Sequence, residues 1–269
     1  MKIFKSFKIL KKNIDFNQSI GFVPTMGALH KGHLSLIRKA KKKSKKVLVS
    51  IFVNPTQFND KKDLMKYPRT LKKDILSLKK LKVDYLFLPH KNEIYKKGIK
   101  QKIHINSKDK TLCALYRKGH FEGVLAVVNR FMENINSKYI FFGEKDYQQI
   151  YLIRKYLQKK FSTKIILCKT IRNKNKLPLS SRNYLLTNKA ILRSQKISKI
   201  IINFKKKISK SLNNLKMKNY YLSKIQNLCD KVEYFEVRSD KDLSIKFSKK
   251  NFKIFIAYYQ NKIRLIDNY

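Results

Sequence analysis

The sequence predicts an α/β protein in which a mostly parallel β-sheet with flanking helices is followed by a small α+β domain. From about residue 18 to about residue 168, short apolar runs alternate with longer basic amphipathic stretches, a rhythm typical of βαβ units. Beyond residue 170 this rhythm gives way to two long lysine-rich helical stretches and three β-like runs. We therefore expect a larger domain over residues 1–170 and a smaller one over residues 171–269.

The elements of the first domain follow from its apolar runs. The expected strands are 20–23, 47–53, 85–88, 139–142 and 164–168. The expected helices, each long enough for a crossover between parallel strands, are 34–45, 71–81, 124–135 and 147–160.

The second domain begins with a polar stretch, residues 172–178, that we expect to act as a hinge. The expected helices that follow are 188–209 and 216–230, and the expected strands are 232–238, 252–259 and 262–266. A short turn at Gln260 and Asn261 separates the last two strands, which predicts a β-hairpin.

The charge balance is extreme, since 64 Lys and Arg against 17 Asp and Glu give a formal net charge of +47. A nucleic-acid-binding protein would gather such charge into a patch with exposed aromatic residues, because phosphate contacts supply its affinity. Here the lysines are spread along the chain, and Lys, Asn, Ile, Tyr and Phe are abundant while Trp is absent, which favours compositional drift in an AT-rich genome. No specific nucleic-acid partner is expected, but the field will attract anionic substrates whatever its origin.

The cysteines and the apolar runs bear on location. Cys113, Cys168 and Cys229 are odd in number and lack the spacing of a disulfide framework or a zinc site. The N-terminus has no apolar stretch of signal-peptide type, and no run approaches the roughly 18 apolar residues of a transmembrane helix. We therefore expect a cytoplasmic protein with reduced thiols and no membrane partner.

The segment GFVPTMGALHKGH predicts a strand, a turn through Gly27 and a basic helix that begins soon after His30. Unpaired backbone N–H groups and the positive end of the helix dipole meet at such a junction and favour an anion such as phosphate. His30 and His33 are expected to project to one side, with Gly32 leaving room for close approach. A polar helix face and a zinc pair remain alternatives, but no neighbouring carboxylate or cysteine completes a metal site.

Polar residues also follow other predicted strands, at the end where ligands of open α/β sheets bind. Gln57 suits a hydroxyl or carboxylate group, or else caps a turn. Asp146 fits either a helix N-cap or an acceptor from ribose hydroxyls, and Lys145 either reaches a phosphate or is solvated. Gln149 falls one helical turn after Lys145.

Two loops carry further cationic groups. Ser180, Ser181 and Arg182 make a polar anion clamp at the expected domain junction, because a guanidinium group matches phosphate geometry. A loop at a junction can also close over a substrate. Arg117 and His120 lie in another loop, where both phosphate contact and plain solvation are possible.

The ordered set PTMGALHKGH, VSIFVNPTQFN, YPRTLKKD, RKGHFEGV, FGEKDYQQ and LSSRN, with a terminal RLID, closely resembles the pantothenate synthetase family over essentially the whole chain. The resemblance implies a Rossmann-like domain of the nucleotidylyltransferase superfamily, a C-terminal lid domain and a homodimer. It also implies that magnesium-ATP and pantoate form pantoyl-adenylate and pyrophosphate, after which β-alanine attacks the acyl carbon and AMP is released.

By position, the resemblance also implies the roles of individual residues. The implied ATP loop is Met26, Gly27, Ala28, Leu29, His30, Lys31, Gly32 and His33, with both histidines on the phosphates and His33 as the proton donor. Further implied ATP contacts are Gly143 and Asp146 at the ribose, Ile171 at the adenine, and Glu144, Lys145, Leu179, Ser180, Ser181 and Arg182. The implied substrate and metal contacts are Gln57 and Gln149 for pantoate and Asp74 for magnesium through water. The expected catalytic residues are His30, His33 and Lys145.

The chain departs from the family pattern at a few positions. Lys31 stands where an acidic residue is usual, Ala114 replaces a usual glycine, and Asn175 with Lys176 replaces an Asp-Gly pair. The last change removes a glycine from the expected hinge loop. All implied contact residues are retained, which favours drift over loss of activity. Another nucleotidylyltransferase and a basic nucleic-acid-binding protein are the alternative functions.

Overall fold

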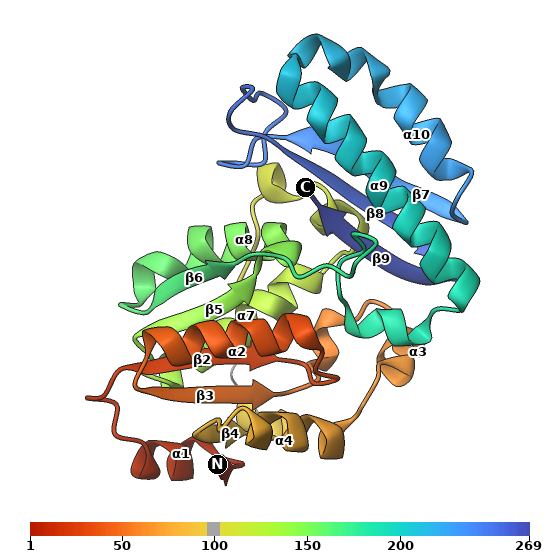
Figure 1. The fold of residues 1–269 in the computed structure, drawn as a ribbon. Coiled ribbons are helices and arrows are strands. Elements are labelled where there is room, and N and C mark those ends of the chain that lie inside the picture. The colour runs from red at the N-terminus through yellow and green to blue at the C-terminus, as the bar shows by residue number, and fades with distance from the viewer. Residues whose placement is uncertain (96–102) are drawn as a thin grey trace. The chain divides into compact units, whose positions relative to one another are not determined.

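The structure, a computed structural model, describes residues 1–95 and 103–269. The chain forms two compact units (Figure 1). The first comprises residues 1–110 and 117–169, and the second comprises residues 111–116 and 170–269. Nothing in the sequence pattern singles out residues 111–116.

A six-stranded parallel sheet forms the centre of the first unit. Its strands are β1 (Lys2–Phe4), β2 (Ile20–Thr25), β3 (Lys46–Ile51), β4 (Tyr85–Phe87), β5 (Tyr139–Gly143) and β6 (Lys164–Cys168). They lie in the order β1-β4-β3-β2-β5-β6, and every neighbouring pair is parallel. Strand order therefore reverses between β2 and β5, and ligands of open α/β sheets bind outside the carboxyl ends of the strands at such a switch point.

Helices connect and cover these strands. The α-helices of this unit are α1 (Phe7–Asn13), α2 (Lys31–Lys43), α3 (Lys61–Lys66), α4 (Leu71–Lys80), α5 (Lys91–Ile94), α7 (His120–Asn134) and α8 (Tyr147–Leu157). The short 3-10 turns are η1 (Pro55–Gln57), η2 (Ser107–Asp109), η3 (Glu144–Asp146) and η4 (Gln158–Lys160).

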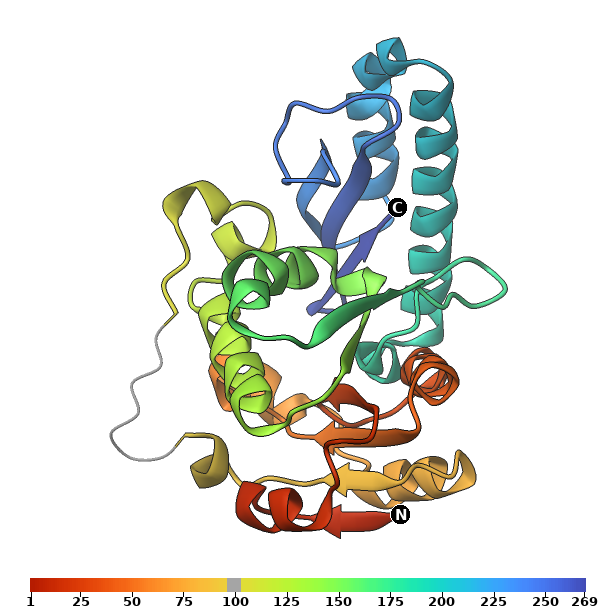
Figure 2. The ribbon, with the colours of Figure 1, turned by 90° about the vertical axis from the view of Figure 1, so that its left-hand side faces the viewer.

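Both faces of the sheet are buried, because helices lie on both sides of it. Val23 of β2 belongs to one apolar cluster with Ile37 of α2 and Leu78 of α4. The neighbouring Phe22 points to the opposite face, where its ring lies 5.4 Å from that of Phe131 in α7. Figure 2 shows α2 and α7 on opposite sides of the sheet. This two-sided burial explains why the strands appear in the sequence as continuous apolar runs.

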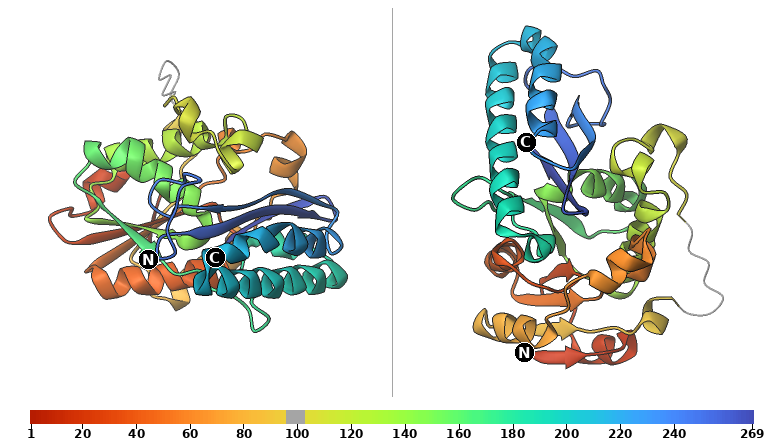
Figure 3. Two further views of the ribbon diagram at one scale, coloured as in Figure 1. Left: turned by 90° about the horizontal axis from the view of Figure 1, so that it is seen from above. Right: turned by 90° about the vertical axis from the view of Figure 1, so that its right-hand side faces the viewer.

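The second unit packs helices against a three-stranded antiparallel sheet (Figure 3). Its elements are α6 (Cys113–Tyr116), η5 (Ser181–Leu185), α9 (Asn188–Lys210), η6 (Leu212–Met217), α10 (Lys218–Gln226), β7 (Lys231–Arg238), β8 (Lys253–Gln260) and β9 (Ile263–Asn268). Phe204 of α9, Ile225 of α10 and Ile256 of β8 are fully buried in one cluster between the helices and the sheet.

The β8–β9 connection has the geometry that a tight hairpin needs. Gln260 pairs with Ile263, so Asn261 and Lys262 alone form the loop. Both loop residues have positive φ angles, 50° and 62°. Two left-handed residues in a two-residue loop are typical of a type I′ turn, whose twist matches that of the flanking strands. The predicted hairpin is therefore confirmed, with its turn one residue later than expected.

The predicted fold class is also confirmed, although several short elements were not predicted and some boundaries differ. β1 pairs with β4 at the sheet edge but was not predicted, because three residues are too few to show a period. α7 begins at His120, because Gly119 adopts a φ of 81° at its N-cap. The predicted helix 216–230 is shorter, since α10 ends at Gln226.

The described residues also bear on thiols and membranes. Cys113 and Cys168 are buried, Cys229 is partly buried, and all three are free thiols. Across residues 1–95 and 103–269, no helix combines the length and the apolarity needed to cross a membrane.

Candidate active site

Two loops lie at the carboxyl edge of the sheet where β2 and β5 are neighbours. One connects β2 to α2, and η3 connects β5 to α8. β2 and β5 run parallel, with Gly21 opposite Tyr139, so the carboxyl ends of both strands lie at the same edge. The N-termini of α2 and α8 therefore begin at this edge as well, and their dipoles favour an anion there.

The loop after β2 has a left-handed turn at its centre. Gly27 has a φ of 80° and Ala28 a φ of 49°. A Cβ atom on Gly27 would lie 3.1 Å from Cγ2 of Ile51, a tight contact, so both the backbone and the space favour glycine. The Thr25 hydroxyl accepts from the Gly27 N–H at 3.2 Å and donates to the Ser50 carbonyl at 2.8 Å, which ties the turn to the sheet.

A buried carboxylate lies beneath this loop. Asp74 of α4 is only 2% exposed. Its Oδ2 accepts from the Ala28 N–H at 3.0 Å, and its Oδ1 accepts from the Leu29 N–H at 2.8 Å. The Thr70 hydroxyl donates to the same Oδ1 at 3.1 Å. Asp74 therefore anchors two successive amides of the predicted ATP loop, a contact that sequence reasoning missed.

His30 and His33 form a reciprocal cap at the start of α2. His30 is the N-cap, and its Nδ1 accepts from the Gly32 N–H at 3.1 Å. Nδ1 of His33 accepts from the His30 N–H at 3.4 Å. The two rings lie on the same side, with centroids 4.1 Å apart. A Cβ on Gly32 would lie 2.7 Å from Cε1 of His30, so this ring position requires glycine.

Both imidazoles are neutral at physiological pH. The pKa of His30 is lowered from its ordinary 6.5 to about 4, chiefly by burial and secondly by the charge of Lys145, while Asp146 acts in the opposite direction. Burial, then His30 and Lys145, hold the pKa of His33 well below 6.5. Because Nδ1 of each ring accepts a backbone hydrogen bond, the proton of the neutral ring lies on Nε2. Each ring therefore offers an Nε2–H donor.

The η3 turn carries the cationic residue that acts on both imidazoles, Lys145. Nζ of Lys145 lies 3.2 Å from Oδ1 of Asp146. Asp146 occupies the N-cap position of α8 but makes no capping hydrogen bond through its side chain. The capping interpretation of this residue therefore finds no support, and its carboxylate is directed to Lys145. Glu144 begins the same turn. A Cβ on Gly143 would meet no atom within 4 Å, so open space lies beside this backbone.

Gln57 ends η1, and its backbone is held by the RKGH segment. The Gln57 carbonyl accepts from Nη2 of Arg117 at 3.0 Å and lies 2.7 Å from Nδ1 of His120. Nη1 of Arg117 lies 2.9 Å from Nε2 of His120. Arginine can only donate, so Nε2 accepts and the Nδ1–H of His120 donates to the carbonyl. Phosphate contact and plain solvation were the expected alternatives for Arg117 and His120, and the structure shows a third role.

Two further residues fix the same loop. Asn54 is 1% exposed, and its Nδ2 donates to the Gly123 carbonyl of α7 at 3.1 Å. A Cβ on Gly123 would lie 2.4 Å from the Thr56 carbonyl oxygen, so η1 and α7 are in backbone contact. Gln149 lies on the first turn of α8, half-buried, one turn beyond Lys145.

The predicted ATP contacts Ile171, Leu179, Ser180, Ser181 and Arg182 belong to the second unit. Ile171 is exposed, and its carbonyl accepts from the Leu179 N–H at 3.0 Å. Ser180 is the N-cap of η5, where its hydroxyl accepts from the Arg182 N–H at 3.3 Å. Ser181 is buried. Met26 and Lys31, at the two ends of the histidine loop, belong instead to the first unit.

Arg172 fixes the base of the loop that carries Ile171. Its guanidinium makes two hydrogen bonds to the buried Asp267, at 2.7 and 2.8 Å, and stacks 4.2 Å from the ring of Tyr269. At the tip, Lys176 adopts a φ of 72°. Lys176 stands where the family pattern has the glycine of an Asp-Gly pair. A lysine therefore adopts the left-handed conformation that a glycine would take without strain.

The described residues offer no dedicated metal cage. Among them, no group of three or more His, Cys, Asp or Glu is arranged to hold an ion. The zinc alternative for His30 and His33 therefore lacks further ligands within the described chain. Both oxygens of Asp74 already accept protein hydrogen bonds.

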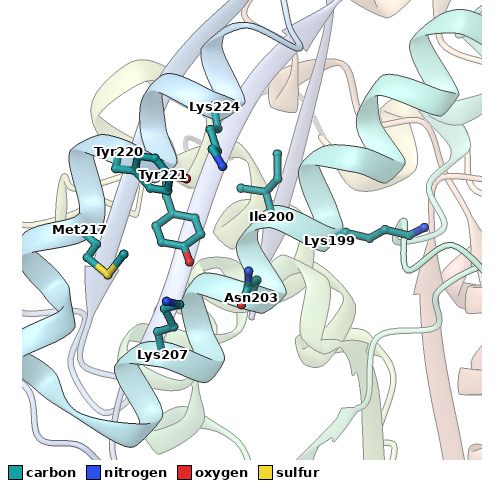
Figure 4. Close-up of a pocket in the computed structure, with 8 residues that line it drawn as sticks. All are labelled: Lys199, Ile200, Asn203, Lys207, Met217, Tyr220, Tyr221 and Lys224. Carbon is teal, nitrogen blue, oxygen red and sulfur yellow. The ribbon is translucent and has the colours of Figure 1, made fainter.

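The second unit also contains a groove. Side chains of α9 and α10 face each other across it (Figure 4). Its lining residues are Lys199, Ile200, Asn203, Lys207, Met217, Tyr220, Tyr221 and Lys224. It contains no predicted site residue, and its lysines match the abundance of lysine along the whole chain.

The chain matches the family model described as pantoate-beta-alanine ligase over residues 2–269. It is 40% identical over 270 residues to a pantothenate synthetase of Francisella tularensis subsp. mediasiatica, covering 98% of this chain and 94% of that protein. A crystal structure of pantothenate synthetase from Thermus thermophilus superposes with a TM-score of 0.92 at 28% identity, covering 100% and 99% of the two chains. That of pantoate-beta-alanine ligase from Francisella tularensis, complexed with beta-gamma ATP and beta-alanine, gives 0.85 at 38% identity, covering 100% and 97%. The agreement extends from end to end, and the chain belongs to the pantoate–β-alanine ligase family.

Proposed function

We propose that this protein condenses pantoate with β-alanine in an ATP-dependent reaction, through a bound pantoyl-adenylate, and releases AMP and pyrophosphate. The observation that carries the proposal is the pair of neutral imidazoles of His30 and His33, influenced by Lys145, at the β2–β5 switch point. Family membership supports it along the whole chain. A relative crystallised with beta-gamma ATP and beta-alanine supports these two substrates.

In the first step, a pantoate carboxylate oxygen attacks the α-phosphorus of ATP. A new P–O bond forms, the bond from the α-phosphorus to the bridging oxygen breaks, and pyrophosphate leaves. Both reactants are anions, so their repulsion must be offset before in-line attack can proceed. The ammonium group of Lys145 and the Nε2–H groups of His30 and His33 supply that offset, and they stabilise charge on the phosphate oxygens as it develops.

The electrostatics of His33 agree with a role at the phosphates. In the free protein its lowered pKa keeps the ring neutral, so it donates a hydrogen bond through Nε2–H. A bound triphosphate opposes the effect of Lys145 and raises the pKa of the imidazole. Substrate binding therefore brings His33 closer to the protonated form that a proton donor needs.

In the second step, the neutral amine of β-alanine attacks the acyl carbon of the adenylate. A C–N bond forms, the bond from that carbon to the AMP oxygen breaks, and the nitrogen loses one proton to solvent. The adenylate is not attached covalently and would hydrolyse if water reached it. We assign the protection of this intermediate to the C-terminal domain, residues 171–269, acting as a lid.

The remaining contacts follow the chemistry of each group. Gln57 and Gln149 would hold the hydroxyl and carboxylate groups of pantoate. Asp146 would accept from ribose hydroxyls, and the open space beside Gly143 suits a ribose. Ile171 would contact adenine, and the polar clamp of Ser180, Ser181 and Arg182 would meet the phosphates.

The proposal includes the setting in which the enzyme works. Magnesium arrives with ATP, because triphosphate oxygens are its preferred ligands. The three free thiols agree with a reducing, cytoplasmic location. A homodimer is expected from the family resemblance, and light scattering coupled to gel filtration would measure its mass.

The deciding experiment measures pyrophosphate release from magnesium-ATP, with and without pantoate and β-alanine. Release should need pantoate, and pantothenate and AMP should appear only when β-alanine is added. His33→Ala should lower the rate by a factor on the order of 10² to 10³, the usual cost of losing one donor to a developing anion. His90→Ala, which removes an exposed histidine of the same unit, should leave the rate unchanged.

Other outcomes would separate the alternatives. Release that requires a phosphorylated acceptor instead of pantoate would identify a different nucleotidylyltransferase. Salt-sensitive nucleic-acid affinity that is indifferent to His33→Ala, with no pyrophosphate release, would favour the nucleic-acid-binding alternative. Either result would overturn the proposed ligase.

A further inference from the structure

The carboxylate of Asp74 makes a two-pronged contact with the histidine loop. Its two oxygens accept from the successive N–H groups of Ala28 and Leu29, one oxygen to each amide. An asparagine has only one acceptor oxygen, and its NH₂ group would face the second N–H. The geometry therefore requires a carboxylate and not merely a polar side chain of the same size.

The loop needs this anchor because its backbone is not in a relaxed conformation. Ala28 adopts a φ of 49°, a left-handed value that is unfavourable for a residue with a Cβ. The bond from the Leu29 N–H to Oδ1 lies immediately before His30. Because His30 is the N-cap of α2 and its N–H meets Nδ1 of His33, the position of this backbone sets the position of both rings.

Asp74 is poorly placed to contact a magnesium ion. It is 2% exposed, and both of its oxygens are engaged by protein donors, including the Thr70 hydroxyl. A hydrated Mg²⁺ needs an accessible oxygen for one of its waters. A contact through water would therefore compete with the bonds that hold the loop.

We propose that Asp74 is a positioning residue that fixes the Gly27–Leu29 turn so that His30 and His33 present their Nε2–H groups to the nucleotide, and that it is not a magnesium contact. This inference rests on the proposed function, because it assumes that ATP binds beside the two histidines. It assigns Asp74 an effect on ATP that is independent of the metal.

The test compares two aspartates whose carboxylates accept from backbone N–H groups at opposite edges of one sheet. Asp74→Asn removes one acceptor from the loop. Asp84→Asn is the matched control, because Asp84 accepts from the Val47 N–H at 2.9 Å and pairs with Lys46 at 3.1 Å, at the amino edge of the sheet. Both variants lose a carboxylate that holds backbone in the first unit, and only one of them touches the loop.

ATP binding to the full chain is measured by calorimetry, once with saturating Mg²⁺ and once in EDTA without metal. Asp74→Asn should raise Kd about tenfold under both conditions, which corresponds to the loss of one charge-assisted hydrogen bond. Asp84→Asn should bind like the parent. If Asp74→Asn weakened ATP binding only when Mg²⁺ was present, Asp74 would be a metal contact. If its Kd for ATP were unchanged, Asp74 would not position the loop. Either result would overturn the inference.

A readout without ligand keeps the inference separate from the proposed function. If the parent protein failed to bind ATP, the ligase proposal would fall, but amide hydrogen exchange would still test the anchor. Exchange at Ala28 and Leu29 should accelerate in Asp74→Asn and stay unchanged in Asp84→Asn. Equal exchange in all three proteins would refute the anchor itself.

A milder variant serves if Asp74→Asn does not fold. Thr70→Val removes one donor to Oδ1 and leaves both loop amides in place. It should raise Kd for ATP roughly two- to threefold, again equally with and without Mg²⁺, because it weakens the support of the Asp74 carboxylate but leaves both of its bonds to the loop amides. An effect confined to the metal-containing condition would count against positioning.

Discussion

The two loops expected to hold the nucleotide are built on the same device but fixed at different places. In the first unit, buried Asp74 holds the main chain of Ala28 and Leu29. In the second unit, buried Asp267 holds the side chain of Arg172 at the base of its loop.

This difference indicates that the first loop is held rigidly next to the residues proposed to act on the nucleotide. The first loop is fixed at the amides next to its histidines, so its donors are held in place before any ligand arrives. The second is held through side chains, because Arg172 at its base also donates to the Lys176 carbonyl at 2.9 Å and Asn175 donates to Oε1 of Gln195 at 3.1 Å. The absence of glycine at Lys176 adds strain to the tip of this loop.

The largest expected effect concerns the charge beside the first loop. Lys145→Ala should lower the rate of adenylate formation by a factor on the order of 10² to 10³, as for other groups that stabilise a developing anion. It should also raise the pKa of His30 and His33, since Lys145 helps to lower both. Rapid-quench kinetics and NMR titration measure the two effects. Lys138→Ala, an exposed lysine before β5, is the control and should change neither.

The next effect tests the anchor of the second loop. Asp267→Asn leaves the partly buried Arg172 guanidinium without its partner charge, so the free energy of unfolding should fall by about 3 kcal/mol. Urea denaturation measures this change. Asp230→Asn, an exposed aspartate that accepts from the Lys262 N–H, should cost well under about 1 kcal/mol. If both variants lost equally little, the base of the second loop would not be fixed and the comparison would fail.

A pH effect should distinguish the first loop from the second. His30 has a folded pKa of about 4 against an ordinary value of 6.5, so below pH 6.5 the unfolded chain takes up a proton that the folded chain refuses. Stability supplied by the neutral ring is therefore present above pH 6.5 and lost as the pH falls to about 4. After allowance for partial exposure, the loss is on the order of 2 kcal/mol.

Urea midpoints of the parent and of His30→Asn between pH 7 and pH 4 measure this loss. The parent should lose about 2 kcal/mol more than the variant over that window. His90→Asn, which changes an exposed histidine, should follow the parent. Parallel curves for the parent and His30→Asn would contradict the burial of a neutral His30.

The smallest effect concerns the tip of the second loop. Lys176→Gly should raise the free energy of unfolding by about 1 kcal/mol, because glycine adopts a φ of 72° without strain. Lys174→Gly, an exposed position of the same loop whose φ is not left-handed, should lower it by a few tenths of a kcal/mol or more. Thermal unfolding of the three proteins is sufficient. If Lys176→Gly lowered the free energy of unfolding, the backbone of Lys176 would not be strained.

Much of the candidate site could be predicted from local pattern. The Gly27 turn, the shared side of His30 and His33 and the start of α8 after Asp146 all follow from residues within one loop. Other features could not be predicted in this way. Gln57 is held through its backbone carbonyl, a group that every residue type has, so its identity does not reveal this contact. The donors to this carbonyl, Arg117 and His120, lie about sixty positions away in the sequence.

The sequence by itself determined the kinds and order of strands and helices, because the period of burial and the residues at turns are local properties of the chain. It also determined which loops carry histidine, lysine and serine. Only the tertiary structure decided which carboxylate holds which loop and which ring nitrogens of His30, His33 and His120 accept. Contacts such as Asp74 with Ala28, or Asp267 with Arg172, depend on the path of the whole chain, and short-range pattern contains no information about that path.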